Sequence, residues 1–302
     1  MKSINSILVV VDPTVERDFV VDRVKLIAKK TGAKTLLYIN NVNILTEHSY
    51  MYEGVDGEFF ETQRKLFAEH YRNLLAQLEK EFRADNLQVS SLFSEQHHLA
   101  EAIIEQARKH KPDLVVKSTH HHGMLERALV TNTDWRLIRK CPAPLLLIKP
   151  QPWNEDGSVV TAVDPLHSKA AQSSLDHALI TSTELVSGLL KQTPRVFHSY
   201  YPFISGMFPM SGESADYMQT IRQKHKDKLE ELLSEHKITE ENVHLSQGEL
   251  VPKLIEYLKS VNANILVIGA LSRNFLERAI VGNTAEKILE GCPCDILVIK
   301  PA

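Results

Sequence analysis

Apolar and polar positions follow the same order in the two halves of the chain. Each half begins with a continuous apolar run that ends in Asp-Pro, at residues 6–13 and 158–165. Such runs are typical of strands buried on both faces. Segments of helical periodicity and further strand-like runs then alternate to the end of each half. Five repetitions of strand and helix predict a parallel sheet with right-handed crossovers, which is a doubly wound, Rossmann-like α/β domain of five strands.

The remaining elements are expected at corresponding places in the two halves. The strands are predicted at 34–40, 87–93, 113–118 and 144–150 in the first half and at 194–201, 243–246, 264–270 and 295–301 in the second, and the longer helices at 58–82, 98–110, 214–236 and 249–260. A loop and a short helix are expected between the fourth and fifth strands of each half.

A direct repeat supports this division of the chain. Residues 125–150 and 276–301 are identical at thirteen of 26 positions, with a constant offset of 151 residues and no gap. A chain of 302 residues suits two domains of about 150 residues each. The sequence therefore predicts tandem copies of one domain, at 1–150 and 158–302, joined by a linker that is rich in Pro, Gly and charge.

Composition excludes several classes of protein. A net charge of −3 gives no basic surface for nucleic acid or an anionic membrane. No apolar run approaches the length of a membrane-spanning helix, and the first 20 residues lack the pattern of a signal peptide. Three cysteines do not make a disulfide framework. A cytoplasmic protein without a membrane span or bound nucleic acid is expected.

The second half carries a candidate phosphate site. Its first strand delivers Asp164 to the carboxyl edge of the sheet, where doubly wound domains bind ligands. Gly269 ends the fourth strand and lets the backbone approach a ligand closely. Gly282, Asn283 and Thr284 begin a helix, and N–H groups at a helix N-terminus favour phosphate. Each residue also has an ordinary role, because glycine is common in turns and Asn or Thr caps helices.

This pattern resembles the nucleotide motif of the universal stress protein family, which reads Gly, two residues, Gly, nine residues, Gly and then Ser or Thr. The resemblance extends over both halves, and the tandem arrangement is similar to that of two-domain members. It implies that ATP or ADP, with or without Mg²⁺, binds with adenine near Asp164 and with its phosphates along the glycine motif. It also implies that the two copies pack through their fifth strands as an intramolecular pseudo-dimer.

The second copy matches the family motif in part. Gly269 and Gly282 correspond to the first and third glycines. Ser272 stands at the second glycine, and its hydroxyl and N–H can both meet a phosphate. Asn283 stands where Ser or Thr is expected, and Thr284 supplies a hydroxyl one place later. We therefore expect one nucleotide per chain, held by the second copy.

The first copy departs further from the motif. Asp12 remains, but Ser118, His121 and Thr131 replace the three glycines. Thr131 is β-branched and places a side chain where a phosphate would need backbone contact. This copy is not expected to bind ATP as the family does. Whether its cleft binds a second, bulky anionic ligand stays open, because three residues could bind it by charge: Lys117, His121 and Arg127.

Three consecutive histidines, His120, His121 and His122, raise the question of a metal site. Adjacent residues rarely reach one ion, and the other histidine pair, at 97–98, follows the third strand, three strand spacings away in the expected order. Exposed loop histidines are the favoured interpretation, and no metal is expected. Cys292 and Cys294 are interpreted as buried packing beside the fifth strand.

Two functions remain in competition. The first is a stress-response protein whose second domain binds ATP or ADP and whose occupancy regulates partner proteins. The second is a scaffold, or a carrier of a bulky apolar or anionic ligand, because apolar segments at 200–210 and 43–54 border the two clefts. No Walker motif or catalytic base is identifiable, so slow ATP hydrolysis is the most that is expected. Whether the tandem chain forms a homodimer stays open.

Overall fold

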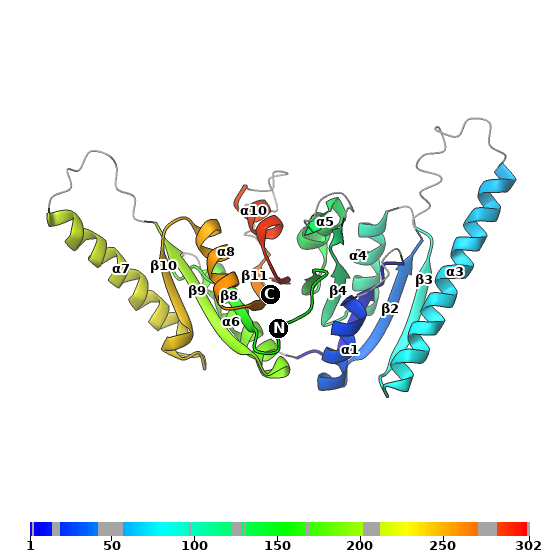
Figure 1. Ribbon diagram of the computed structural model, residues 1–302, viewed down its shortest axis with the longest axis horizontal. Helices are drawn as coiled ribbons and strands as arrows, with labels where there is room; N and C mark the ends of the chain where they lie inside the picture. Colours follow the sequence, from blue (N-terminus) through cyan, green and yellow to red (C-terminus); the bar gives the residue numbers. More distant parts are fainter. Residues whose placement is uncertain are drawn as a thin grey trace. The chain divides into compact units, whose positions relative to one another are not determined.

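The computed structural model describes residues 1, 3–13, 19–41, 57–96, 98–121, 128–129, 131–166, 170–201, 212–270 and 283–300. The chain divides into two compact units. The first domain is Ser3–Pro150, and the second domain is Gln151–Ala302 together with Met1–Lys2. In Figure 1 the first domain runs from blue to green and the second from green to red.

The first domain alternates strands with helices. Its elements are β1 (Ser6–Val10), α1 (Phe19–Thr31), β2 (Lys34–Asn40), α3 (Gly57–Ala84), β3 (Val89–Ser94), α4 (Leu99–His110), β4 (Leu114–Ser118), the short antiparallel pair β5 (His120–His121) and β6 (Ala128–Leu129), α5 (Asn132–Lys140) and β7 (Leu145–Ile148). The main sheet has the order β3-β2-β1-β4-β7, and all of these strands are parallel.

The second domain repeats this plan. Its elements are β8 (Ser158–Ala162), α6 (Ala170–Leu190), β9 (Thr193–Tyr200), α7 (Gly212–Leu233), the 3-10 turn η2 (Glu240–Asn242), β10 (Val243–Gln247), α8 (Leu250–Ser260), β11 (Ala263–Gly269), α10 (Asn283–Gly291) and β12 (Asp295–Ile299). Its parallel strands have the order β10-β9-β8-β11-β12.

The burial of the strands follows from their sequences. Central strands such as β1 and β11 are runs of Ile, Leu and Val that are buried on both faces. The edge strands β3 and β10 carry Ser, His and Gln among their apolar residues and stay partly exposed. Right-handed crossovers place α1 and α3 on one face of the first sheet and α4 and α5 on the other, with α6, α7, α8 and α10 placed likewise in the second domain.

The structure confirms the predicted fold of two tandem doubly wound domains. The strand predicted at 34–40 has these same bounds, and the helices predicted at 98–110 and 249–260 each begin one residue later. The strands predicted at 6–13 and 158–165 are shorter than expected, because each ends before its Asp-Pro turn. The loop predicted after β4 is in part the two-stranded ribbon of β5 and β6.

The segment between the two copies is fastened to the second domain. Trp153 Nε1 donates a hydrogen bond to Asp295 Oδ2 at 2.8 Å. Asn264 makes two hydrogen bonds of 2.8 Å to the backbone of Asn154: its Oδ1 accepts from the N–H, and its Nδ2 donates to the carbonyl oxygen. The predicted linker is therefore an ordered extension of the second domain. Among the described residues, no helix has the length and apolar character that crossing a membrane requires.

Candidate functional site

Asp164 lies at the carboxyl edge of the second sheet. It follows Val163, whose N–H donates to the carbonyl of Phe197 on β9 at 3.1 Å. The Asp164 carboxylate is exposed and accepts a hydrogen bond from the N–H of Leu166 at 3.4 Å. The strand order reverses beside it, between β8 and β11, and this is where doubly wound sheets bind ligands.

Gly269 ends β11, the strand next to β8. The register that pairs Thr161 with Val267 brings Asp164 and Gly269 to the same edge of the sheet. A Cβ atom at Gly269 would lie 2.7 Å from Cδ2 of Leu175 on α6, so the absence of a side chain lets α6 pack closely on the strand. Close helix packing is thus a second reason for this glycine, beside the predicted approach of a ligand.

The remaining motif residues are described in part. Ser272 and Gly282 lie outside the described residues. Asn283 and Thr284 are the first two residues of α10, as the sequence predicted. Because α10 connects two parallel strands, its N-terminus lies at the same carboxyl edge as Asp164. A helix N-terminus at this edge is a suitable place for an anion.

In the first domain the equivalent helix N-terminus is occupied by the protein itself. Thr131 caps α5, and its Oγ1 accepts a hydrogen bond from the N–H of Asp134 at 3.2 Å. The Asp134 carboxylate in turn accepts hydrogen bonds from the N–H of Thr131 at 2.8 Å and from its hydroxyl at 2.9 Å. Lys117 Nζ lies 2.9 Å from the other carboxylate oxygen. A buried carboxylate and its counter-ion therefore stand where a phosphate would have to bind.

The second copy lacks all three of these residues. At the constant offset of 151, Thr131 corresponds to Gly282, Asp134 to Ala285 and Lys117 to Ile268. The first acidic residue of α10, Glu286, comes one position after the capping-box position. The second copy therefore has no carboxylate at the position that corresponds to Asp134, which caps the N-terminus of α5 in the first copy.

The other motif positions of the first copy lie at the carboxyl edge of its own sheet. Ser118 ends β4, and among the described residues its buried hydroxyl has no hydrogen-bond partner. Asp12 follows β1. Burial raises the pKa of Tyr71 on α3, and the nearby charge of the Asp12 carboxylate raises it further. His121 belongs to the ribbon strand β5.

Three side chains beside Asp164 were not anticipated from the sequence. Burial raises the pKa of Asp176 on α6 to about 7. A hydrogen bond from the backbone of Asp164 lowers this pKa, and the charge of the Asp164 carboxylate raises it. His198 on β9 is buried, and its ring nitrogens lie 2.9 Å from the carbonyl oxygen of Val163 and 2.7 Å from Nδ1 of His225. Burial lowers the pKa of His225. The position of His198 directly after the apolar pair Val196 and Phe197 of β9 was the available signal.

The hydrogen-bond roles in this pair follow from the carbonyl. The Val163 oxygen can only accept, so Nδ1 of His198 donates to it. In a neutral ring Nε2 then accepts from Nδ1 of His225. The chain of contacts links the backbone before Asp164 to α7 and orders this side of the site.

An acidic cavity of about 350 Å³ lies next to Asp164, between α6 and α7. Its lining includes four carboxylates, from Asp164, Asp176, Glu231 and Glu235, and the ammonium of Lys228 is paired with Glu231 at 2.5 Å. This lining repels phosphate.

The histidine cluster shows no metal site in the described part of the chain. His120 and His121 form β5, and His122 lies outside the described residues. No group of three or more His, Cys, Asp or Glu residues within the described ranges could hold a metal ion. The strand order places β2 and β1 between β3 and β4, which separates His98 from the histidine ribbon as expected.

Two further expectations concern packing and apolar segments. Cys292 and Cys294 are buried beside the start of β12, with their sulfur atoms 3.4 Å apart, and this confirms the packing interpretation. Of the apolar segment 200–210, only Tyr200 and the exposed Tyr201 are described. The segment 43–54 lies outside the described residues.

Known proteins resemble the chain over its whole length. The sequence model of the universal stress protein family matches residues 3–149 and 157–300. Universal stress protein E of Photorhabdus laumondii is 28% identical over 309 residues, which cover 100% of this chain and 96% of the relative. Universal stress protein E of Escherichia coli K12 is 34% identical over 208 residues, which cover 67% of this chain and 65% of the relative.

Solved structures show the same fold. A protein of unknown function from Pseudomonas aeruginosa PAO1 superimposes with a TM-score of 0.77 at 24% identity, covering 99% of this chain and 94% of the other. A universal stress protein from Archaeoglobus fulgidus superimposes with a TM-score of 0.63 at 15% identity, covering 99% of both chains.

Proposed function

Because this chain belongs to the universal stress protein family, we propose that its second domain binds one molecule of ATP or ADP and that occupancy of the site regulates partner proteins. The proposal rests on the difference between the two copies at one helix N-terminus. In the first copy Asp134 and Lys117 occupy it. In the second copy Ala285 and Ile268 stand at these positions and can supply neither charge.

The charges of the second domain support one orientation of the nucleotide. The acidic cavity beside Asp164 disfavours phosphate but suits hydrogen-bond donors, such as the amino group of adenine and the ribose hydroxyls. The N-terminus of α10 favours phosphate because its backbone N–H groups are donors and its dipole is positive there. Base and phosphate thus have separate places at one edge of the sheet.

Binding rather than catalysis is the function that we propose. Asp164 and Asp176 line the cavity that we propose for the base. Hydrolysis of ATP requires an oriented water and neutralisation of charge at the γ-phosphate. We expect at most slow hydrolysis.

Calorimetric titration of the full chain with ATP and with ADP tests the proposal. We expect one nucleotide per chain, and we expect Gly282→Val to abolish binding because a β-branched side chain would obstruct the start of α10. Thr131→Val, at the equivalent position of the first copy, is the matched control and should leave the affinity unchanged. Absence of binding by the folded wild-type chain would favour the scaffold or carrier instead.

A further inference from the structure

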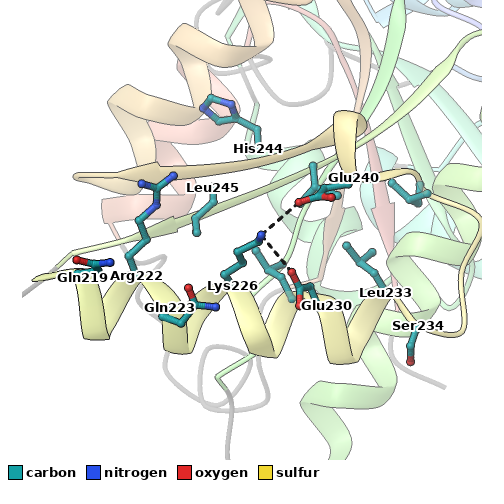
Figure 2. Close-up of a pocket in the computed structure, with 13 residues that line it drawn as sticks. Gln219, Arg222, Gln223, Lys226, Glu230, Leu233, Ser234, Glu240, His244 and Leu245 are labelled. Carbon is teal, nitrogen blue, oxygen red and sulfur yellow. Dashed lines mark ion pairs between the residues drawn. The ribbon is translucent and has the colours of Figure 1, made fainter.

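A groove of about 770 Å³ lies between α7 and the edge strand β10, away from Asp164 (Figure 2). Five of its lining residues are apolar: Leu229, Leu233, Ile238, Val243 and Leu245. Polar side chains of α7 line the rest, and Figure 2 shows Gln219, Arg222, Gln223 and Lys226 along the helix. The groove is large enough for several side chains of a ligand.

One wall of the groove is a strand with an open edge. Among the described residues β10 pairs only with β9, so its other edge presents backbone N–H and C=O groups to a further strand. Val243 and Leu245 line the groove. His244, between them, also lines the groove, and its ring stacks on that of Tyr257 of α8 with centroids 4.3 Å apart. A strand added to β10 would therefore direct alternate side chains into the groove.

The corresponding place in the first domain holds a smaller cavity of about 390 Å³, whose lining includes Arg72 of α3. There the guanidinium of Arg72 lies 4.5 Å from the centre of the Phe93 ring. The strand registers pair Ile39 with Phe93 and His198 with Leu245, so Leu245 takes the place of Phe93. The smaller side chain accompanies the larger groove of the second domain.

Helix α7 also differs from its counterpart α3 at this edge of the sheet. Buried Leu75 and Leu78 of α3 correspond to Leu229 and Leu232 of α7, which aligns Arg72 with Lys226. Lys226 does not cover the strand, because its ammonium lies 3.2 Å from Glu240 and 3.4 Å from Glu230 (Figure 2). The two copies have thus diverged at this edge.

The charges of the groove indicate the chemistry of its ligand. Arg222 is exposed and points toward β10 in Figure 2, and it has no ion-pair partner in the part of the chain that the structure describes. The other end of the groove holds Lys226 between two carboxylates. A ligand with a carboxylate at the Arg222 end complements this distribution.

We propose that the groove between α7 and β10 binds an extended peptide segment of a partner protein, which adds to β10 as a strand, inserts apolar side chains and places a carboxylate against Arg222. Backbone hydrogen bonds to β10 hold the segment, and the apolar floor and Arg222 select its sequence. This surface is separate from the proposed nucleotide site and does not depend on it.

Fluorescein-labelled hexapeptides test this proposal by anisotropy with the full chain. The probes are Thr-Val-Thr-Val-Thr-Glu and its reverse, because a strand can add in either direction. We expect one of them to bind saturably with a dissociation constant below about 100 µM. A probe with Lys in place of Glu, and one N-methylated at alternate residues, should each bind about tenfold more weakly, since the first loses the Arg222 contact and the second loses backbone pairing.

Variants of the chain locate the binding. Arg222→Glu and Leu245→Lys should each weaken binding about tenfold or more. Lys224→Glu makes the same kind of charge change on α7 outside the groove and should have no effect. Both Arg222 and Lys224 are exposed, so these two variants retain the fold.

Three results would overturn the proposal. These are no saturable binding of either acidic probe, equal binding by the N-methylated probe, or equal binding by the Arg222→Glu and wild-type chains. If no probe binds and Leu245→Lys converts a dimer into a monomer in sedimentation experiments, the groove is instead an interface between copies of this chain.

Discussion

The ammonium group of Lys117 and the carboxylate of Asp134 lie 2.9 Å apart, with only 3% and 0% of their side chains exposed. Lys117 also donates to the carbonyl of Ser118 at 2.7 Å, and Asp134 accepts two hydrogen bonds from Thr131. The two hydrogen bonds reach one oxygen of the Asp134 carboxylate, and the ammonium of Lys117 neutralises the other in a buried place. Removing one partner of such a pair leaves the other charge uncompensated.

Lys117→Met is therefore expected to lower the free energy of unfolding by roughly 3–5 kcal/mol. The double variant Lys117→Ile with Asp134→Ala carries the residues of the second copy and should cost less than the sum of its single changes. Urea unfolding followed by circular dichroism measures this coupling. Strictly additive costs would contradict the ion pair as the source of the effect.

Asp176 makes the stability of the second domain depend on pH. Its folded pKa of about 7 exceeds the ordinary aspartate value of 3.8, so the folded state binds more protons than the unfolded state between these two values. The stabilisation is complete below about pH 4 and is lost as the pH rises through 7. Asp176→Asn removes this loss, and its stability relative to wild type should increase from pH 4 to pH 8 by on the order of 2–4 kcal/mol.

Urea midpoints at several pH values measure this difference. Asp216→Asn, an exposed change on α7, is the control and should run parallel to wild type. A constant difference between Asp176→Asn and wild type over the whole range would show that Asp176 keeps an ordinary pKa.

The fifth strands provide a further prediction. Each of β7 and β12 stands at one edge of its own five-stranded sheet, and both are apolar. An apolar edge strand needs a cover, and the family resemblance implies that the two copies cover each other as a pseudo-dimer. The amides of 145–148 and 295–299 should then exchange with deuterium as slowly as those of the central strands β1 and β8. Exchange within the rate range of the opposite edges, β3 and β10, would exclude this pairing.

The sequence predicted the fold well because the central strands of each sheet are short apolar runs between turn residues. The segment 34–40 illustrates this, since its apolar residues and flanking turns leave no other strand boundary. Gly269 was harder to interpret. A glycine at the end of a strand fits both a nearby ligand and a nearby helix, and only the position of Leu175 shows the helix contact.

The charged contacts could not be predicted from the sequence. Asp176, His198 and His225 come from α6, β9 and α7, and periodicity does not determine which side chains of different elements meet. Lys117 at the end of an apolar strand was interpreted as a free positive charge for a ligand. In the structure it is buried against Asp134, which the sequence analysis did not single out.

The last prediction transfers the occupied helix N-terminus from the first copy to the second. Ala285→Asp places the carboxylate of Asp134 at the start of α10 and keeps Gly282. The new carboxylate should occupy the N-terminal N–H groups and repel phosphate, so ATP and ADP affinity should fall about a hundredfold or more. Calorimetry on the full chain measures the loss.

Ala285→Asn, which also keeps Gly282, is the matched control. It has nearly the same shape but no added charge, so it should bind nucleotide more tightly than the Asp variant, and the difference should shrink at high salt because ionic screening weakens the repulsion. Circular dichroism establishes that both variants are folded. Wild-type affinity in the folded Asp variant would place the phosphates somewhere other than α10. The difference between the two copies would then no longer be a reason to assign the nucleotide to the second domain.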